Sequence, residues 1–502
     1  MLTRLKVSGF KNLVDVDVRF GPFTCVTGPN GAGKSNLFDA IRFLSALADE
    51  TLVNAALSVC AGGKRPSDIS SLFYRIGDRS AQEMSFEAEM IIPGEGIDDL
   101  GQKAKASITF LRYTLFLAYR AAKGLPSMES IELIREDLDY IKLGEAWRHL
   151  RFPHKAGTWR KSAVQGKRTS PLISTGFEGK NRIIKLIQEG GGRKTNAVLA
   201  SALPRTVLST VNTIENPAAL LARREMQSWQ MLQLQPSSIH TSDRFPAPRG
   251  RLGADGFHLA AALYCLAYSD KYTGCTTDNE AAVRFYDKIA ARLAELMNVV
   301  YGIRIDRDEH RSLLTLELID RNGTVYPAHS LSYGTLRFLA LAVLEANPKA
   351  GRLICLEEPE NGIYPERIPA LLQLLQGMVT DVKRRIGPDN PLRQIIVTTY
   401  SPAIVNMVPD DSLLFAESAE TFKDGRKMKG VCFRWLPDTW RQRAAPEVNT
   451  VIKDSLPGHF VPPVSEYQDS KRQPIKSRHK RAEEITSHPD LQLPLPCFSD
   501  LG

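Results

Sequence analysis

Hydrophobic and polar residues alternate near the start of the chain, and the period then changes. Between residues 14 and 20 every second residue is apolar, which predicts a strand with one buried face. The mostly apolar run 23–26 follows directly and predicts a strand that is buried on both faces. After a glycine-rich turn, apolar residues recur at helical spacing from Leu37 to Leu47. The pattern therefore predicts two strands, a loop and an amphipathic helix, in this order.

The second half of the chain carries further periodic segments. Apolar residues at helical spacing between residues 283 and 296 predict an amphipathic helix, but no heptad register persists, so we expect no long coiled-coil arm. Residues 314–318 alternate up to Asn322-Gly323, a dipeptide that is typical of tight hairpin turns. Residues 430–435 predict one more strand.

Two stretches lack a sustained period. Residues 91–250 mix strand-like pieces at 107–110 and 130–134 with basic, glycine-containing loops, which predicts an inserted lid or arm. The alternative is a variable surface insertion without chemistry of its own. After residue 435 a Pro-rich stretch and the basic run 471–481 predict a flexible basic tail. We therefore divide the chain into segments 1–90, 91–250, 251–420 and 421–502.

Composition narrows the class of protein. Of the 502 residues 43% are hydrophobic and 24% are charged, which is typical of globular proteins. The net charge of +9 indicates either a polyanionic partner such as nucleic acid or a merely solvated basic surface. The seven cysteines form no C-x-x-C pair, so we expect neither a disulfide framework nor a zinc site, and we expect the reducing cytoplasm. The apolar patch 259–268 is too short to span a membrane, so we expect no membrane partner.

The glycine-rich turn between the buried strand and the first helix carries the first chemistry. Residues 28–35 match the pattern G-x-x-x-x-G-K-[ST] of a P-loop in the required strand–loop–helix context. Lys34 is expected to reach the β- and γ-phosphates of ATP, and the Ser35 hydroxyl to bind Mg²⁺. The residues expected to cradle the phosphates are Asn30, Gly31, Ala32, Gly33, Lys34, Ser35 and Asn36.

Two adjacent carboxylates follow a second buried strand. The apolar run 353–356 ends in Glu357 and Glu358, and open α/β sheets bind ligands at the carboxyl ends of their strands. Neighbouring side chains on a strand point in opposite directions, so the two glutamates are expected to differ in role. We assign Glu357 to the magnesium shell and Glu358 to the attacking water as the catalytic general base.

A third motif precedes the apolar helix predicted at 336–344. Taken alone, Leu331-Ser332-Tyr333-Gly334-Thr335 could be an ordinary helix cap. Together with the other two motifs it resembles the ABC-class ATPases of the chromosome-maintenance and RecF type, whose signature reads L-S-x-G-x. The resemblance implies that Ser332 and Gly334 contact the γ-phosphate held by an opposite subunit. ATP would then be sandwiched in a homodimer, or in a higher homo-oligomer, of such heads.

Other segments extend the resemblance in the expected order. Residues 360–362 resemble the D-loop, residues 395–399 with Tyr400 resemble the switch strand, and residues 9–12 resemble the first turn of these heads. The likeness is greatest to stand-alone prokaryotic AAA/ABC ATPases related to the overcoming-lysogenization-defect proteins, many of which serve in anti-phage defence. It covers residues 1–90 and 250–410. It implies an α/β fold: a bilobed ABC-type head, made of a P-loop NTPase sheet with an N-terminal antiparallel β region, interrupted by a mixed α+β insertion.

Three positions depart from that family pattern. Tyr400 stands where the switch histidine is usual, and a phenol does not become cationic near neutral pH. Our hypothesis is that Tyr400 still contacts the nucleotide, that hydrolysis is slow and that the ATP-bound dimer is long-lived. Tyr364 replaces a second histidine without an interpretation, and no glutamine can be assigned to the Q-loop.

Two functions from different classes are compatible with these motifs. The first is a cytoplasmic ATP-driven switch in anti-phage defence that controls an effector protein such as a nuclease. Residues after 420 lack a metal-binding carboxylate set, so we expect a nuclease effector to be a separate protein. The second is a DNA-binding clamp in repair or maintenance. A third reading, in which ATP is bound only structurally, is disfavoured by Glu358. For the clamp, the candidate DNA contacts are Lys155, Arg160, Lys161, Lys167, Arg168, Arg193 and Lys194.

Overall fold

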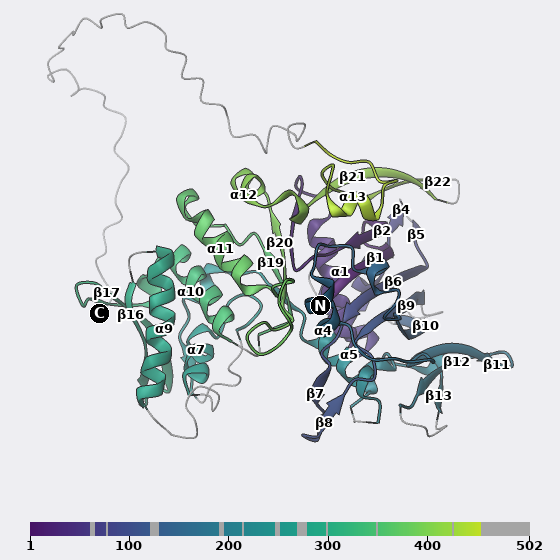
Figure 1. Ribbon diagram of the computed structural model, residues 1–502, viewed down its shortest axis with the longest axis horizontal. Coiled ribbons are helices and arrows are strands. Elements are labelled where there is room, and N and C mark those ends of the chain that lie inside the picture. Colours follow the sequence, from purple (N-terminus) through teal and green to yellow (C-terminus); the bar gives the residue numbers. More distant parts are fainter. Residues whose placement is uncertain are drawn as a thin grey trace, which may run out of the picture. The chain divides into compact units, whose positions relative to one another are not determined.

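The computed structural model describes most of the chain, and Figure 1 shows it as a ribbon. The described residues are 1–60, 66–76, 79–120, 130–189, 195–212, 215–245, 252–268, 279–297, 300–347, 350–423 and 426–452. Arg193, Lys194 and the basic run 471–481 lie outside them. No helix in this part of the chain is long and apolar enough to cross a membrane.

An antiparallel sheet contains the first strands of the chain. Its eight strands have the order β13-β12-β11-β10-β9-β6-β1-β2. Their bounds are β1 Leu2–Phe10, β2 Leu13–Arg19, β6 Glu83–Ile91, β9 Phe110–Arg120, β10 Ser130–Tyr140, β11 Ile173–Glu178, β12 Asn181–Ile187 and β13 Thr195–Leu199. The alternation predicted between residues 14 and 20 forms β2, in which Val14, Val16 and Val18 are buried and Asp15 and Asp17 are exposed. One face of this strand therefore belongs to the core.

The P-loop belongs to a second sheet of six strands in the order β14-β19-β20-β3-β21-β22. All neighbouring pairs in it are parallel except the antiparallel pair β21 and β22. Their bounds are β3 Phe23–Thr27, β14 Gln230–Leu232, β19 Leu353–Glu357, β20 Gln394–Thr399, β21 Leu413–Lys423 and β22 Arg426–Arg434. Thr27 of β3 pairs in register with Thr399 of β20, and Glu357 of β19 pairs with Thr398. The strand ends that carry the predicted motifs therefore lie along one edge.

Helices cover the P-loop sheet, and alternate residues of its central strands enter two different cores. In β20, Ile395 and Val397 pack into one core and Ile396 into the other, which explains why the whole strand is buried. The helices of eight or more residues are α1 Lys34–Leu47, α2 Leu52–Val59, α5 Pro217–Gln227, α7 Leu259–Ala267, α9 Asn279–Met297, α10 Tyr333–Ala346 and α11 Ile368–Met378.

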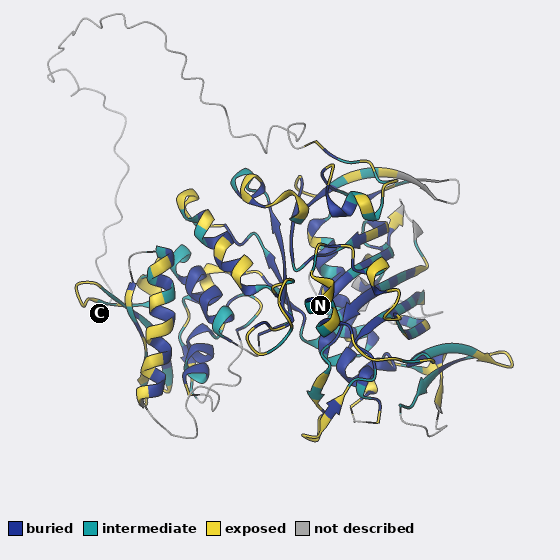
Figure 2. Cartoon of the chain, in the orientation of Figure 1, coloured by how far each residue is buried: buried dark blue, intermediate teal, exposed yellow. Residues whose placement is uncertain are grey.

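A small antiparallel sheet packs with α7 and α9. It has the order β15-β17-β16, with β18 beside β17. Its strands are β15 Asp243–Arg244, β16 Val300–Asp308, β17 Leu313–Asp320 and β18 Val325–Pro327. Figure 2 shows α9 with a buried and an exposed face, as expected from its apolar spacing. The remaining short elements are β4 Arg75–Ile76, β5 Arg79–Ser80, β7 Glu95–Ile97, β8 Lys103–Lys105, α3 Ala146–His149, α4 Lys161–Ala163, α6 Pro236–Ile239, α12 Pro402–Met407 and α13 Trp440–Ala444.

Most predicted elements are confirmed. The predicted α/β class, with an antiparallel β region followed by a P-loop sheet, is observed. The helix expected at 283–296 is α9, and the hairpin at Asn322-Gly323 joins β17 to β18 with Gly323 at φ 80°. The strand predicted at 107–110 is wrong in position, because β9 begins only at Phe110.

The predicted division of the chain stays a prediction, but its boundaries do not separate the sheets. Strands β9 to β13 come from segment 91–250 and continue the sheet of β1, β2 and β6. Strand β14 comes from the same segment and pairs with β19 of the P-loop sheet. Most of segment 91–250 is therefore part of the head. The sequence did not indicate this, because a local pattern does not show which strands pair with each other.

Candidate functional site

The P-loop turns tightly between β3 and α1. Gly28, Gly31 and Gly33 have φ angles of 150°, 76° and 109°. A Cβ atom on Gly28 would lie 2.2 Å from the carbonyl oxygen of Ala416, and one on Gly33 would lie 2.5 Å from the amide of Asn12. Only glycine satisfies both the backbone angle and the space at these two positions. The first turn of α1 has no side-chain cap, so its N–H groups remain available for an anion.

The remaining predicted phosphate-binding residues divide between the loop and its surroundings. Asn30 and Gly31 are exposed, and Ala32 is buried. The Asn36 side chain donates a hydrogen bond of 2.7 Å to Asn12 in the turn after β1. Asn12 also donates to the Ala32 carbonyl at 3.4 Å. The turn at residues 9–12, noted in the sequence only by resemblance, therefore supports the P-loop directly.

Lys34 is held by protein groups where the phosphates are expected. Its ammonium donates hydrogen bonds of 2.6 Å to the Gly28 carbonyl and 3.0 Å to the Pro29 carbonyl. The same nitrogen lies 3.6 Å from the ring centroid of Tyr400, a cation–π contact. Burial lowers the pKa of Lys34 to about 8, although the Glu358 carboxylate acts in the opposite direction. The structure thus brings Lys34, Tyr400 and Glu358 together.

Glu357 and Ser35 are also brought together. Glu357 ends β19, and the Ser35 hydroxyl at the start of α1 lies near enough to its carboxylate to act toward a lower pKa. Burial raises the pKa of Glu357, and the carboxylates of Asp39 and Glu358 raise it further. A carboxylate and a hydroxyl are oxygen ligands of the kind that Mg²⁺ binds beside substrate phosphates. The two residues predicted to bind the metal therefore fit that ion.

Glu358 has an unusual backbone conformation for a non-glycine residue. Its φ angle is 45°, in the left-handed region. Its N–H donates to the Thr398 carbonyl at 3.0 Å, and its carboxylate accepts a hydrogen bond from the Asn361 amide. Such a conformation costs free energy and persists only where neighbouring groups hold it, as often occurs at functional sites.

Two buried polar residues hold this turn in place, and sequence reasoning missed one of them, Arg337. Arg337 on α10 is 3% exposed and donates to the carbonyls of Glu358 at 2.9 Å and Asn361 at 2.6 Å. Glu360 is buried, accepts a hydrogen bond from the Thr399 hydroxyl and has a raised pKa because of its burial. Glu360 lies in the segment that resembles the D-loop, whereas no local pattern marks Arg337, because its partners lie elsewhere in the chain.

The signature residues lie at the N-terminus of α10. The Ser332 hydroxyl accepts a hydrogen bond from the Thr335 N–H at 3.2 Å, so the helix-cap role is real, and Ser332 is exposed. Gly334 lies so close to Gly362 that a Cβ would be 2.9 Å from the Gly362 carbonyl oxygen. The described contacts of Ser332 and Gly334 do not include the P-loop of the same chain. Tyr364, the other unusual tyrosine, is 77% exposed.

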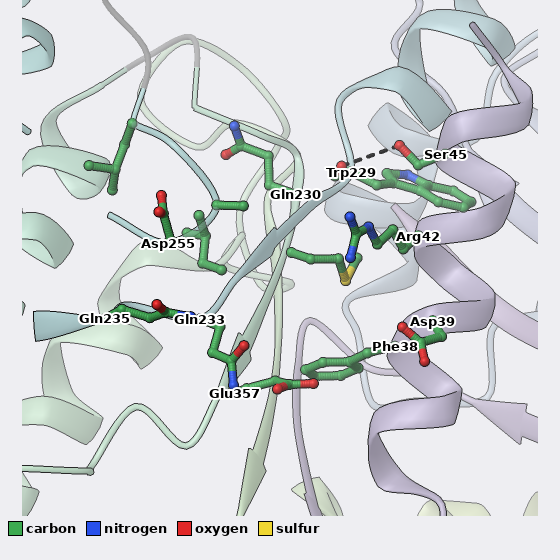
Figure 3. A pocket seen from close by; sticks show the side chains of 14 residues that line it. Phe38, Asp39, Arg42, Ser45, Trp229, Gln230, Gln233, Gln235, Asp255 and Glu357 are labelled. Carbon is green, nitrogen blue, oxygen red and sulfur yellow. Dashed lines mark hydrogen bonds between the residues drawn. The ribbon is translucent and has the colours of Figure 1, made fainter. Parts of the chain in front are cut away.

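A cavity of about 540 Å³ lies beside Glu357, between α1 and β14. Figure 3 shows Asp39 and Arg42 projecting from α1 on one side and Gln233 reaching toward Glu357 on the other. Gln233 directly follows β14, which pairs with β19. We therefore propose Gln233 for the Q-loop position, to which no glutamine could be assigned from the sequence. The sequence pattern gave little indication of this position, because β14, the strand before Gln233, has only three residues.

Comparisons with known proteins match both ends of the head. Residues 228–406 match the family model described as AAA domain, putative AbiEii toxin, Type IV TA system, and residues 1–58 match the RecF/RecN/SMC N terminal domain. An OLD nuclease of Thermus scotoductus is 51% identical over 41 residues, or 8% of each chain. The replication and repair protein RecF of Magnetococcus marinus is 49% identical over 45 residues, which is 9% of this chain and 12% of RecF. The chain thus spans only a small part of the curated relatives that it matches.

Solved structures with some likeness include SMC heads. The SMC head bound to the C-winged helix domain of ScpA is 14% identical with a TM-score of 0.39, covering 87% of this chain and 98% of that one. The Thermotoga maritima SMC head is 10% identical with a TM-score of 0.34, covering 87% and 98%. The two family models and the short matches to OLD and RecF agree with the P-loop, glutamate pair and signature already described. These matches support an ABC-class ATPase similar to the RecF, SMC and OLD proteins.

Proposed function

We propose that this head binds ATP with Mg²⁺ and hydrolyses it. The observation that carries the proposal is the convergence of Lys34, Ser35, Glu357 and Glu358 at one edge of the P-loop sheet. Ser35 and Glu357 would hold the Mg²⁺, which when bound would balance charge on the phosphates. Nothing else in the part of the chain that the structure describes offers this combination with a P-loop.

The chain's own residues account for the proposed steps. Lys34 would exchange its hydrogen bonds to the carbonyls of Gly28 and Pro29 for bonds to the β- and γ-phosphates. Glu358, held by Asn361 and by Arg337 through its carbonyl, would orient the attacking water and accept its proton. Gln233 lies where its amide could contact the metal shell beside Glu357.

Pairing of two heads follows from the position of the signature. Ser332 is exposed at the start of a helix of 14 residues, so its hydroxyl and the helix N-terminus are available to a phosphate from outside. We infer that this phosphate is the γ-phosphate bound to a second copy, which makes ATP the bridge of a homodimer. ATP then changes assembly because it binds the paired state more tightly.

Beyond the head, we propose a switch that controls a separate effector protein, plausibly a nuclease, in cytoplasmic anti-phage defence. The matches to a putative AbiEii toxin model and to an OLD nuclease support this reading. The matches to RecF and to the chromosome partition protein Smc of Bordetella petrii, 32% identical over 102 residues, equally support a DNA-binding clamp. These regions are 18% of this chain and 9% of that Smc. An effector that co-purifies and changes activity with ATP would distinguish the switch from the clamp.

ATP turnover tests the proposed chemistry. We expect wild-type protein to hydrolyse ATP, Glu358→Gln to bind ATP but stall, and Lys34→Ala to fail to bind. Glu366→Gln changes a carboxylate that is exposed and makes no described ion pair, so it is the matched control and should turn over ATP like wild type. If wild type and both site variants are equally inactive, the head only binds nucleotide and the proposal fails.

A further inference from the structure

A group of cations gathers from two segments that lie far apart in the sequence. The Lys155 N–H donates to the Val382 carbonyl at 2.9 Å, and the Thr158 hydroxyl donates to the Lys383 carbonyl at 3.0 Å. The Ile386 N–H donates to the Ser162 hydroxyl at 3.0 Å. These bonds join segment 142–161 to segment 383–385. We call their cations the basic surface: Lys142, Arg148, Arg151, Lys155, Arg160, Lys161, Lys383, Arg384 and Arg385.

The basic surface stands on a hydrophobic cluster of its own. Trp159 is fully buried and packs edge-on against Phe152, with ring centroids 5.5 Å apart. Phe152 also meets Trp440 of α13 at 6.3 Å, and Leu392 belongs to the same cluster. The cations are therefore displayed by a packed framework, which reduces the entropy lost when they bind a partner.

The charges of the basic surface are not neutralised within the chain. All nine are at least partly exposed, and in the described residues none of them forms an ion pair. By contrast, Arg4, Arg112, Arg135 and Arg292 all pair with carboxylates. The two segments contain one acidic residue, Glu145, and Asp139, Asp381 and Asp389 are the acidic residues within four positions of them in sequence. Unpaired cations at this density favour a polyanion, which releases counterions when it binds.

An exposed aromatic residue lies among these cations. The side chain of Trp147 is 50% exposed, and the guanidinium groups of Arg148 and Arg151 lie 5.2 Å and 5.9 Å from its ring. Cations that follow a phosphate backbone beside a ring that accepts a base are typical of single-strand binding. In a duplex the base faces are already stacked, so the indole would gain little there.

We propose that the basic surface binds single-stranded nucleic acid through its phosphates, with Trp147 stacking on an unpaired base. This site goes beyond the nucleotide site and does not depend on ATP hydrolysis. It also corrects the contacts expected from the sequence. Arg168 pairs with Glu189 and has a side chain only 9% exposed, so it is not available. Lys155, Arg160 and Lys161 belong to the basic surface, and Lys167 is exposed but is not part of it. The sequence did not indicate the segment 383–385.

Fluorescence anisotropy with labelled oligonucleotides tests the proposal on the full chain. The triple variant Lys155→Glu, Arg384→Glu, Arg385→Glu should bind a 30-nucleotide single strand at least about tenfold more weakly, and the slope of log K against log salt should fall by about 2. Trp147→Ala should weaken single-strand binding about fivefold or more and leave duplex binding unchanged. Matched DNA and RNA strands identify which sugar is preferred.

The control reverses three exposed cations elsewhere, Lys288→Glu, Arg311→Glu and Arg321→Glu, and so changes the net charge equally. It should bind like wild type. The proposal is overturned if the control weakens binding as much as the triple variant. It is overturned also if duplex binds as tightly as single strand with Trp147→Ala without effect, or if wild type binds no nucleic acid. Loss of ATP turnover alone would instead count against the proposed function.

Discussion

At the scale of residues, Lys34 makes contacts within the protein that it must give up when ATP binds. The Lys34 ammonium is bound to two carbonyls of its own loop and covered by the Tyr400 ring. The P-loop and the glutamate pair could be predicted because each is contiguous in sequence. Gln233 and Arg337 could not be, since they reach the site from elements whose placement depends on distant strand pairing.

Tyr400 is predicted to limit turnover. Its phenol stacks on Lys34 and cannot carry a positive charge near neutral pH, whereas a histidine can donate to the γ-phosphate in either protonation state. We expect Tyr400→His to raise kcat by about tenfold, which is less than the roughly 10²–10⁴-fold effect of a positioned general acid or base. Tyr400→Phe, which keeps the ring, should not raise it. Unchanged turnover in Tyr400→His would remove the explanation of slow hydrolysis.

The lowered pKa of Lys34 predicts a pH dependence of ATP binding. Above the pKa of about 8 the nucleotide-free lysine loses its proton, so affinity for a non-hydrolysable ATP analogue should fall by up to about tenfold per pH unit. A Lys34→Arg variant keeps its charge and should show a flat profile over the same range. A flat wild-type profile between pH 7 and 9.5 would contradict the assignment.

The same pKa sets the sign of a stability change. Because the pKa of Lys34 is lower in the folded state than its ordinary value of 10.5, the unfolded chain binds more protons between pH 8 and 10.5. The contribution of Lys34 to the free energy of unfolding of the nucleotide-free protein therefore rises with pH in that window. Comparison of wild type with Lys34→Ala by urea unfolding isolates this contribution.

At the scale of elements, the signature helix α10 is coupled to the catalytic turn. The Arg337 side chain extends from α10 and donates hydrogen bonds to the carbonyls of Glu358 and Asn361. It also donates to the carbonyl of Leu234 at 2.8 Å, next to Gln233 in sequence. A shift of α10 when a second head binds would therefore reach the backbone of Glu358. The helix itself was predictable from its apolar run, but this polar link through its buried face was not.

Replacing Arg337 tests that coupling. Arg337→Met removes three hydrogen bonds from the guanidinium to backbone carbonyls, so we expect the free energy of unfolding to fall by about 2 kcal/mol. We also expect kcat to fall more than ATP affinity, because Glu358 is displaced while the P-loop is intact. Arg337→Lys should restore part of both. If urea unfolding changes but kcat does not, Arg337 is only structural.

At the scale of the whole molecule, segment 91–250 shows where sequence reasoning stops. Its strands extend the sheet of β1 and β2 through pairs that are distant in sequence, as in the pairing of Leu138 with Ile173, 35 residues apart, and of Phe86 with Leu115, 29 residues apart. Periodicity indicates a strand and its buried face, but not its neighbour. The segment therefore resembled an insertion, while the fold uses it to extend the head and to carry part of the basic surface.

The central claim is that ATP pairs two heads through the exposed signature. The most direct measurement is the solution mass of Glu358→Gln with and without ATP and Mg²⁺, beside the double variant Glu358→Gln, Ser332→Arg. The account predicts that ATP at least doubles the 55.8 kDa mass of a single Glu358→Gln chain, and that the double variant binds ATP without this gain. A mass that ATP leaves unchanged, or an equal gain in the double variant, would contradict it.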